Sequence, residues 1–186
     1  MNKFVVPLLA PSFNRLRADA VWVTIANWAD GFEDKYGKAE VLAGNSSYTA
    51  DQIRARCFTA KTDEISNRKP NWFRHTYLAK LLEMLAKDIR WYSEEKKELS
   101  IDIERFQDAP FVWQHHDLFQ TRGLKLAKKL GVPSVLFVDA PYVWESKKWG
   151  VHRFGWEWFA RNRGDAQPCK MADLILVVSE DVKRAV

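Results

Sequence analysis

Three side chains with acid–base chemistry follow two short apolar segments of the chain. Asp139 comes directly after Ser134–Val138, and His115 and His116 come directly after Phe111–Gln114. Short apolar runs rich in β-branched and aromatic residues are typical of strands buried on both faces of a parallel sheet. In open α/β sheets the carboxyl ends of the strands border the crevice that binds ligands. The three side chains are therefore candidates for hydrogen bonding and proton exchange with a ligand.

Each of these side chains also has a structural interpretation. The Asp139 carboxylate can cap or fix its own loop, because short acidic side chains bond readily to nearby backbone N–H groups. A histidine can be satisfied inside the loop that follows its strand. If the extended geometry persists, His115 and His116 point to opposite sides of the sheet. Both interpretations stay open, and so does the question of whether Asp139 acts as a base.

Strands and helices alternate along the chain and would position these residues. Further strands are predicted at Phe4–Leu9, Ala39–Leu42 and Leu174–Val178. Helices are predicted at Asp19–Tyr36, at Gln120–Leu130 and after the capping residue Ser179. This order implies a parallel sheet with helices on both faces, so we expect an α/β, Rossmann-like single domain over residues 1–186. No Gly-x-Gly-x-x-Gly, Walker-type or nucleophile-elbow motif is present, and a dinucleotide site of the usual kind is not expected.

The middle of the chain carries weaker signals. Residues 45–47 are loop-like, Thr49–Arg56 fits a short capped helix, and 61–70 is polar and rich in turn residues. A long helix is predicted to begin at Pro70, with one broad apolar face and one solvated side. We assign to the apolar face Phe73, Tyr77, Leu78, Leu81, Leu82, Leu85, Ile89 and Tyr92. We assign to the solvated side Lys80, Glu83, Lys87, Asp88 and Arg90.

Composition excludes several classes of protein. With 47% hydrophobic and 28% charged residues over 186 positions, the chain can bury a core and is far from the disordered class. Cys57 and Cys169 lack metal-type spacing and are expected to be reduced thiols of a cytoplasmic protein, and we predict no metal site and no bound cofactor. No run approaches the roughly 18 apolar residues of a spanning helix, so any membrane contact would be peripheral. The apolar start of the chain favours a buried first strand over a signal peptide.

Nine Trp residues and a net charge of +5 are the unusual features of the composition. Together they suggest contact with phosphates, anionic lipid or an acidic substrate, although a simply basic protein remains an alternative. Aromatic and cationic residues alternate most densely in Lys147–Arg163, which contains Trp149 and Arg153. This pattern is typical of a lipid interface, of a lipid-diphosphate acceptor site or of stacking on sugar rings. The same aromatics can pack on the sheet, and we expect some of each.

Several stretches in combination resemble one family. Gly131–Glu145, Ala172–Lys183, Phe111–Phe119 and Trp22–Phe32 are similar, in order and spacing, to the amino-terminal half of group 1 glycosyltransferases (family 4) of the GT-B fold. The resemblance covers most of the chain, and its strongest motifs lie between 111 and 183. It implies one of two Rossmann-like domains that face each other across a cleft. In the family this domain mainly holds the acceptor, and the carboxyl-terminal domain, absent from this sequence, binds the nucleotide-sugar.

The resemblance also implies an activity. It implies the acceptor-binding half of a retaining glycosyltransferase, which moves a sugar from a nucleotide-sugar to a glycan or lipid-linked acceptor in surface polysaccharide synthesis. Transfer would require the carboxyl-terminal domain, in cis or in trans. The location implied is cytoplasmic, with peripheral contact at the inner face of the membrane left open.

Roles for individual residues follow from the resemblance. Asp139 stands where many members have a histidine and one subgroup has Asn before Ala-Pro, which implies a place beside the transferred sugar or the acceptor hydroxyl. His116 matches the histidine after the preceding strand. Glu145 matches the acid after the Ala-Pro pair, with ion pairing to a neighbouring Lys or Arg as the alternative. Family members often carry glycines in the loop after the first strand, but Pro11–Arg17 has none. The other implied substrate-binding residues are His115, Asn14, Arg15, Arg17, Arg153 and Trp149.

Two further classes of function remain open. One is a non-catalytic basic module that binds anionic membrane or nucleic acid through Lys147–Arg163, with nucleic acid the less favoured partner. The other is half of a different GT-B enzyme, such as a sugar-nucleotide epimerase.

Overall fold

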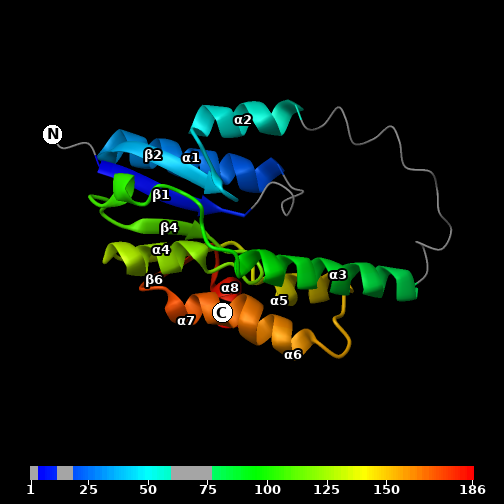
Figure 1. The fold of residues 1–186 in the computed structure, drawn as a ribbon. Helices are drawn as coiled ribbons and strands as arrows, with labels where there is room; N and C mark the ends of the chain where they lie inside the picture. Colours follow the sequence, from blue (N-terminus) through cyan, green and yellow to red (C-terminus); the bar gives the residue numbers. More distant parts are fainter. Residues whose placement is uncertain (1–3, 12–18, 60–76) are drawn as a thin grey trace.

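The computed structural model describes residues 4–11, 19–59 and 77–186, which form a six-stranded sheet flanked by helices (Figure 1). The strand order is β3-β2-β1-β4-β5-β6. All neighbouring pairs are parallel except β2–β3, which is antiparallel. The strands are β1 (Phe4–Ala10), β2 (Gly37–Ala43), β3 (Ser46–Tyr48), β4 (Val112–His115), β5 (Ser134–Val138) and β6 (Leu174–Val177). The α/β class and the mostly parallel sheet expected from the sequence are therefore present.

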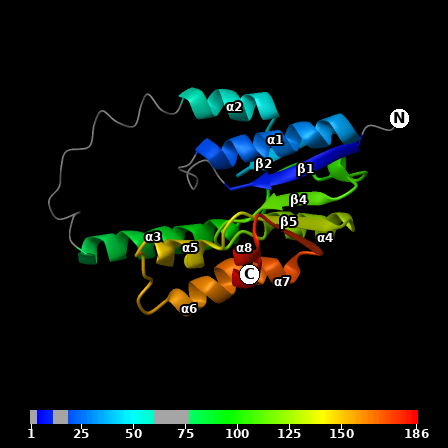
Figure 2. The ribbon, with the colours of Figure 1, turned by 180° about the vertical axis from the view of Figure 1, so that it is seen from behind.

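Helices connect these strands across the sheet (Figures 1 and 2). The longer ones are α1 (Asp19–Tyr36), α2 (Ala50–Thr59), α3 (Tyr77–Glu95) and α4 (Arg122–Leu130). The shorter ones are the 3-10 helix η2 (Glu104–Phe106), α5 (Tyr142–Lys148), α6 (Glu157–Phe159), the π-helix η3 (Ala160–Ala166), α7 (Gln167–Met171) and α8 (Glu180–Ala185). None of the helices in the described ranges is long and apolar enough to cross a membrane.

Alternating side chains of the strands enter separate cores on the two faces of the sheet. Leu8 of β1 packs with Trp22 and Ile25 of α1, whereas the next residue, Leu9, packs with Leu126 of α4. This alternation follows from the two-residue period of a strand. The apolar runs of β1, β2 and β4 are thus buried on both sides, as parallel strands are, whereas the run predicted as β6 lies at the edge of the sheet and its Leu174 is 52% exposed.

The chain reverses its direction of winding between β1 and β4. From β1 it moves to β2 on one side, and later elements build β4, β5 and β6 on the other side. In doubly wound sheets, such a switch point opens a crevice at the carboxyl ends of the strands. His115 ends β4 at this point, and Asp139 follows β5, the next strand along.

Two local features were predicted well and one was missed. Gly131 closes α4 in the left-handed conformation, at φ 71°. Thr49 and Gln52 cap α2 reciprocally, since each backbone N–H donates to the other side chain. Residues 45–47 were expected to be a loop, but Ser46 and Ser47 belong to β3. The reason is a tight turn at Gly44, which has φ 67° and folds β3 back onto β2.

The predicted faces of the long helix need a correction. Asp88 was assigned to the solvated side but is buried, while Leu78, Leu82 and Ile89 were assigned to the apolar face and are each more than half exposed. Asp88 can be buried because Arg153 and the indole N–H of Trp156 both donate to its carboxylate. The predicted helix start at Pro70 and the residue Phe73 lie outside the described residues.

Candidate active site

His115 and Asp139 meet at the carboxyl ends of β4 and β5. Nε2 of His115 lies 3.4 Å from Oδ2 of Asp139. The imidazole is almost fully buried, and within the described residues neither of its ring nitrogens has a hydrogen bond, so the two side chains are close but not aligned for one. The Asp139 side chain is 41% exposed. The open carboxylate of Asp139 can still accept a hydrogen bond from a ligand hydroxyl, whereas the imidazole nitrogens beside it are buried.

The surroundings of Asp139 keep its carboxyl group ionised. Burial raises the pKa of this carboxyl, but contact with His115 and a hydrogen bond from the Ala140 N–H outweigh it, so the pKa lies below its ordinary value. Glu145 lies one turn into α5. Its partial burial, and after that the nearby charge of Asp139, raise the pKa of its carboxyl group. Asp139 is therefore a carboxylate, and not a carboxylic acid, at neutral pH.

His116 points to the other side of β4 and contacts Asp165 of the π-helix η3. Its Nε2 lies 3.2 Å from Oδ1 of Asp165, and both side chains are buried. The same carboxylate accepts the backbone N–H groups of Tyr142 and Val143 at 2.9 and 2.8 Å. Since a carboxylate only accepts, Nε2 of His116 donates, and Nδ1 of the same ring is buried without a hydrogen bond among the described residues. Asp165 thus fixes both the ring of His116 and the start of α5.

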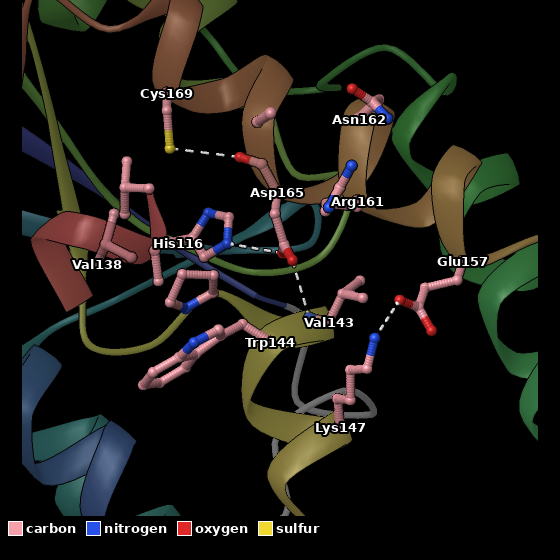
Figure 3. Close-up of a pocket in the computed structure, with 14 residues that line it drawn as sticks. His116, Val138, Val143, Trp144, Lys147, Glu157, Arg161, Asn162, Asp165 and Cys169 are labelled. Atoms are coloured by element: carbon pink, nitrogen blue, oxygen red, sulfur yellow. Dashed lines mark hydrogen bonds and ion pairs between the residues drawn. The ribbon is translucent and has the colours of Figure 1, made fainter. Parts of the chain in front are cut away.

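A cavity of about 370 Å³ lies beside this second pair, as Figure 3 shows. His116, Asp165 and Trp144 line it, together with Val138 and Pro141, the residues on either side of the Asp139–Ala140 turn. Further lining comes from an ion pair between Lys147 and Glu157, and from Arg161, Asn162 and Cys169. An aromatic wall with amide, cationic and imidazole groups suits a polar ligand that carries hydroxyl groups.

The Cys169 side chain in this cavity is held in its uncharged thiol form. Burial, followed by the charge of Asp165, raises its pKa to about 11, so that it is a thiol at neutral pH. Its Sγ lies 3.3 Å from the backbone carbonyl oxygen of Asp165, to which it donates. No group of three or more His, Cys, Asp or Glu in the described ranges is arranged to hold a metal ion.

The loop between β4 and α4 is held by side chains rather than by regular structure. Gln114 donates to the carbonyl of Gln120 and accepts the Gly123 N–H, both at 2.7 Å. Phe119 has φ 68°, a left-handed conformation that is costly for a residue with a Cβ. Its N–H donates to the carbonyl of Gly164, which joins the loop to η3. These contacts fix the loop that follows the two histidines.

The other predicted site residues have varied positions. Glu145 is exposed, and the structure gives its carboxylate no ion pair among the described residues. Trp149 is 79% exposed at the end of α5. Arg153 is buried, and its guanidinium donates to Asp88 and to Ser146. Its donors are thus used within the protein. Asn14, Arg15 and Arg17 lie outside the described residues.

Sequence reasoning missed Asp165 and Trp144 as parts of the site. Asp165 reaches His116 from 49 residues further along the chain, and nothing local in the sequence marks this pairing. The unusual helix η3 is the structural sign, since π-helical turns are frequent at functional sites. Trp144 follows the Ala-Pro pair by three residues, so its place on the wall of a crevice could have been inferred from the motif.

No family model, curated protein or solved structure matches the chain. The structure shows the fold and the positions of these side chains. A function for the chain therefore depends on the chemistry of its own residues.

Proposed function

We propose that the chain is the acceptor-binding half of a retaining glycosyltransferase of the GT-B type. It would act in the cytoplasm with a nucleotide-sugar domain, supplied in cis or in trans, and would hold a glycan or lipid-linked acceptor for surface polysaccharide synthesis. The resemblance between 111 and 183 suggests this class, and the mostly parallel sheet is compatible with it.

One observation carries the proposal. The His115–Asp139 pair has an open carboxylate and an imidazole without hydrogen bonds at the carboxyl edge of the sheet, where ligands of doubly wound folds bind. The loop that carries Asp139 also borders the 370 Å³ cavity that His116 lines. Hydrogen-bonding groups therefore lie on both sides of the end of β4, and they could bind more than one hydroxyl group of a sugar.

The chemistry of transfer suits a carboxylate that stays ionised. The acceptor oxygen forms a bond to the sugar carbon, while the bond to the nucleoside diphosphate breaks and its electron pair leaves with the diphosphate, whose departing oxygen takes the proton of the acceptor hydroxyl. Positive charge develops on the sugar ring in this step, and a fixed negative group nearby stabilises it. In this proposal the carboxylate of Asp139 has that role and accepts a hydrogen bond from the sugar or the acceptor hydroxyl. His115 would orient the carboxylate, and His116, which lines the cavity, would contact the acceptor.

The test is sugar transfer by the chain together with its nucleotide-sugar domain. That domain would be sought in the reading frame that continues beyond Val186 or in a neighbouring gene, and product would be followed from a radiolabelled nucleotide-sugar. We expect transfer to need both domains and to fall by roughly 10²-fold or more in Asp139→Asn, the loss typical when one transition-state contact is removed.

The matched control is Asp173→Asn. Asp173 accepts the N–H and O–H of Ser134, the first residue of β5, and therefore lies at the opposite end of the strand that Asp139 follows. Transfer should survive this change. Equal loss in both variants, or transfer that does not respond to Asp139→Asn, would contradict the proposal.

A further inference from the structure

Exposed apolar side chains gather on two segments that pack against each other. The first set, called here the α3 strip, is Leu78, Leu82 and Ile89. The second, called the aromatic strip, is Trp149, Phe154 and Trp158, from the end of α5 to α6. Each of these six side chains is more than half exposed. Large apolar side chains grouped in this way mark an interaction surface, whereas scattered single ones do not.

The α3 strip follows from the helical period. Leu82 and Ile89 stand four and eleven residues after Leu78, which places all three on one side of α3. The helix packs on the protein through a different side, where Asp88 and Trp91 are buried. The apolar strip is therefore additional to the face that stabilises the fold.

A buried ion pair joins the two strips. Nε of Arg153 donates to Oδ2 of Asp88 at 2.6 Å, and Nε1 of Trp156 donates to the same oxygen at 3.0 Å. Asp88 is next to Ile89 in the chain, and Arg153 is next to Phe154. Removing either charge would leave the other buried and unpaired, so this contact fixes the strips relative to one another.

The surroundings of the strips are cationic. Residues 142–163 contain five Lys or Arg and two Glu, and one of the five, Arg153, is neutralised by Asp88. Helix α3 adds no further excess, because its Lys80, Lys87 and Arg90 stand beside Glu83, Asp88, Glu94 and Glu95, so the positive charge lies on residues 142–163. Tryptophan and leucine beside Lys and Arg are the combination found in segments that lie in the headgroup region of a bilayer.

The strips also lie at one end of the molecule. The first half of α3 and the connection from α5 to α6 project past the carboxyl ends of the strands, to the right in Figure 1 and to the left in Figure 2. The candidate site is at the same edge of the sheet. A surface that rests on a bilayer here would bring the site close to the headgroups.

We propose that the α3 strip and the aromatic strip together dock the protein on the surface of an anionic phospholipid bilayer. Binding combines burial of the apolar side chains among the headgroups with attraction of the Lys and Arg residues to anionic lipid. The occupant of this surface is lipid and not a protein partner, because the exposed aromatic side chains share one short segment with four exposed cations, Lys147, Lys148, Arg161 and Arg163.

The experiment is co-sedimentation of the full chain with vesicles. Vesicles of phosphatidylcholine with phosphatidylglycerol should bind the chain more tightly than vesicles of phosphatidylcholine alone, and added salt should weaken binding. Two triple variants test the strips: Leu78→Ser with Leu82→Ser and Ile89→Ser, and Trp149→Ser with Phe154→Ser and Trp158→Ser. Each should reduce partitioning by about tenfold or more, given the apolar area that it removes.

The control is the double variant Phe4→Ser with Val23→Ser, which removes exposed apolar side chains on β1 and α1. It should bind vesicles like the unaltered chain, and circular dichroism should show that all variants fold. The proposal is overturned by absence of binding to the anionic vesicles, by equal binding to both kinds of vesicle, by strip variants that bind normally, or by an equal loss in the control. Vesicle binding is measured without any sugar. The membrane proposal can therefore fail while the proposed sugar transfer stands, and the transfer can fail while vesicle binding is observed.

Discussion

Two histidine–aspartate pairs lie at the end of β4, and they differ in how fully the carboxylate is used. Asp165 is 8% exposed and accepts from His116 and from two backbone N–H groups. Asp139 is 41% exposed, and its contacts are the Ala140 N–H and a poorly aligned approach from His115. The carboxylate of the first pair is saturated by the protein, whereas the carboxylate of the second has capacity left for a ligand.

The difference separates a structural pair from a candidate reactive pair of the same residue types. A buried carboxylate with three donors costs much to disturb, because each donor would be left without a partner. A half-exposed carboxylate beside a histidine can exchange its solvent contacts for those of a ligand at little cost to folding. We therefore expect loss of stability when the first pair is changed, and loss of function without loss of stability when the second is changed.

The largest effect should come from Asp165→Ala. The change leaves the N–H groups of Tyr142 and Val143 and the Nε2–H of His116 buried without acceptors. We expect a loss of about 3–5 kcal/mol in the free energy of unfolding, measured by urea denaturation followed by circular dichroism. The matched change Asp139→Ala should cost less than about 1 kcal/mol. Similar losses in the two variants would contradict the distinction between the pairs.

The next effect concerns the helix that carries Asp165. In Gly164→Ala the new Cβ would overlap Cδ1 of Leu118 and crowd the ring of Phe119, so η3 would have to shift. We expect a loss of about 1–3 kcal/mol in urea denaturation. Gly31→Ala is the control, since α1 has open space there and alanine favours a helix, which should stabilise the protein by about 0.5–1 kcal/mol. A neutral result for Gly164→Ala would mean that Asp165 is not held rigidly.

The sequence predicts well the strands β4 and β5 and the positions of the polar residues that follow them. Apolar runs with polar residues after them identify β4 and β5, and the two-residue period of a strand predicts that His115 and His116 point to opposite sides, as they do. Both histidines and Asp139 could be placed at one edge of the sheet, because consecutive parallel strands end together. These are local patterns, and local patterns can be recognised in a single sequence.

The other half depends on partners that are distant in the chain. Asp88 is a charged residue of the kind found on a solvated helix face. It is buried because Arg153 and Trp156, 65 and 68 residues further along the chain, donate hydrogen bonds to its carboxylate. The partnership of His116 with Asp165 is of the same kind. The exposed α3 strip was missed for the reverse reason, since apolar periodicity alone does not say whether a helix face meets a core or something outside the protein.

A smaller effect should appear in the titration of Asp139. His115→Phe keeps a buried ring but removes the imidazole contact that lowers the pKa of this carboxyl, so the pKa should rise. A lowered pKa in the folded state contributes stability above the ordinary carboxyl range, and that stability is lost as the pH falls through the lowered value. The variant should lack this acid-side loss. Carboxyl ¹³C shifts measured across a pH series would check the pKa, and no change in it would exclude His115 as the partner.

The smallest effect tests how far the open charge of Asp139 reaches. Burial raises the pKa of Glu145 first, and the charge of Asp139 adds to it, so Asp139→Asn should lower this pKa while leaving it above the ordinary value. A raised carboxyl pKa stabilises the folded state at low pH and weakens it as the pH rises through the raised value, so the variant should lose less stability on that rise. The same ¹³C titration measures the shift, and Asp173→Asn, at the other end of β5, should not cause it. If Glu145 titrates identically in all three proteins, Asp139 is not the charged neighbour that the proposed chemistry requires.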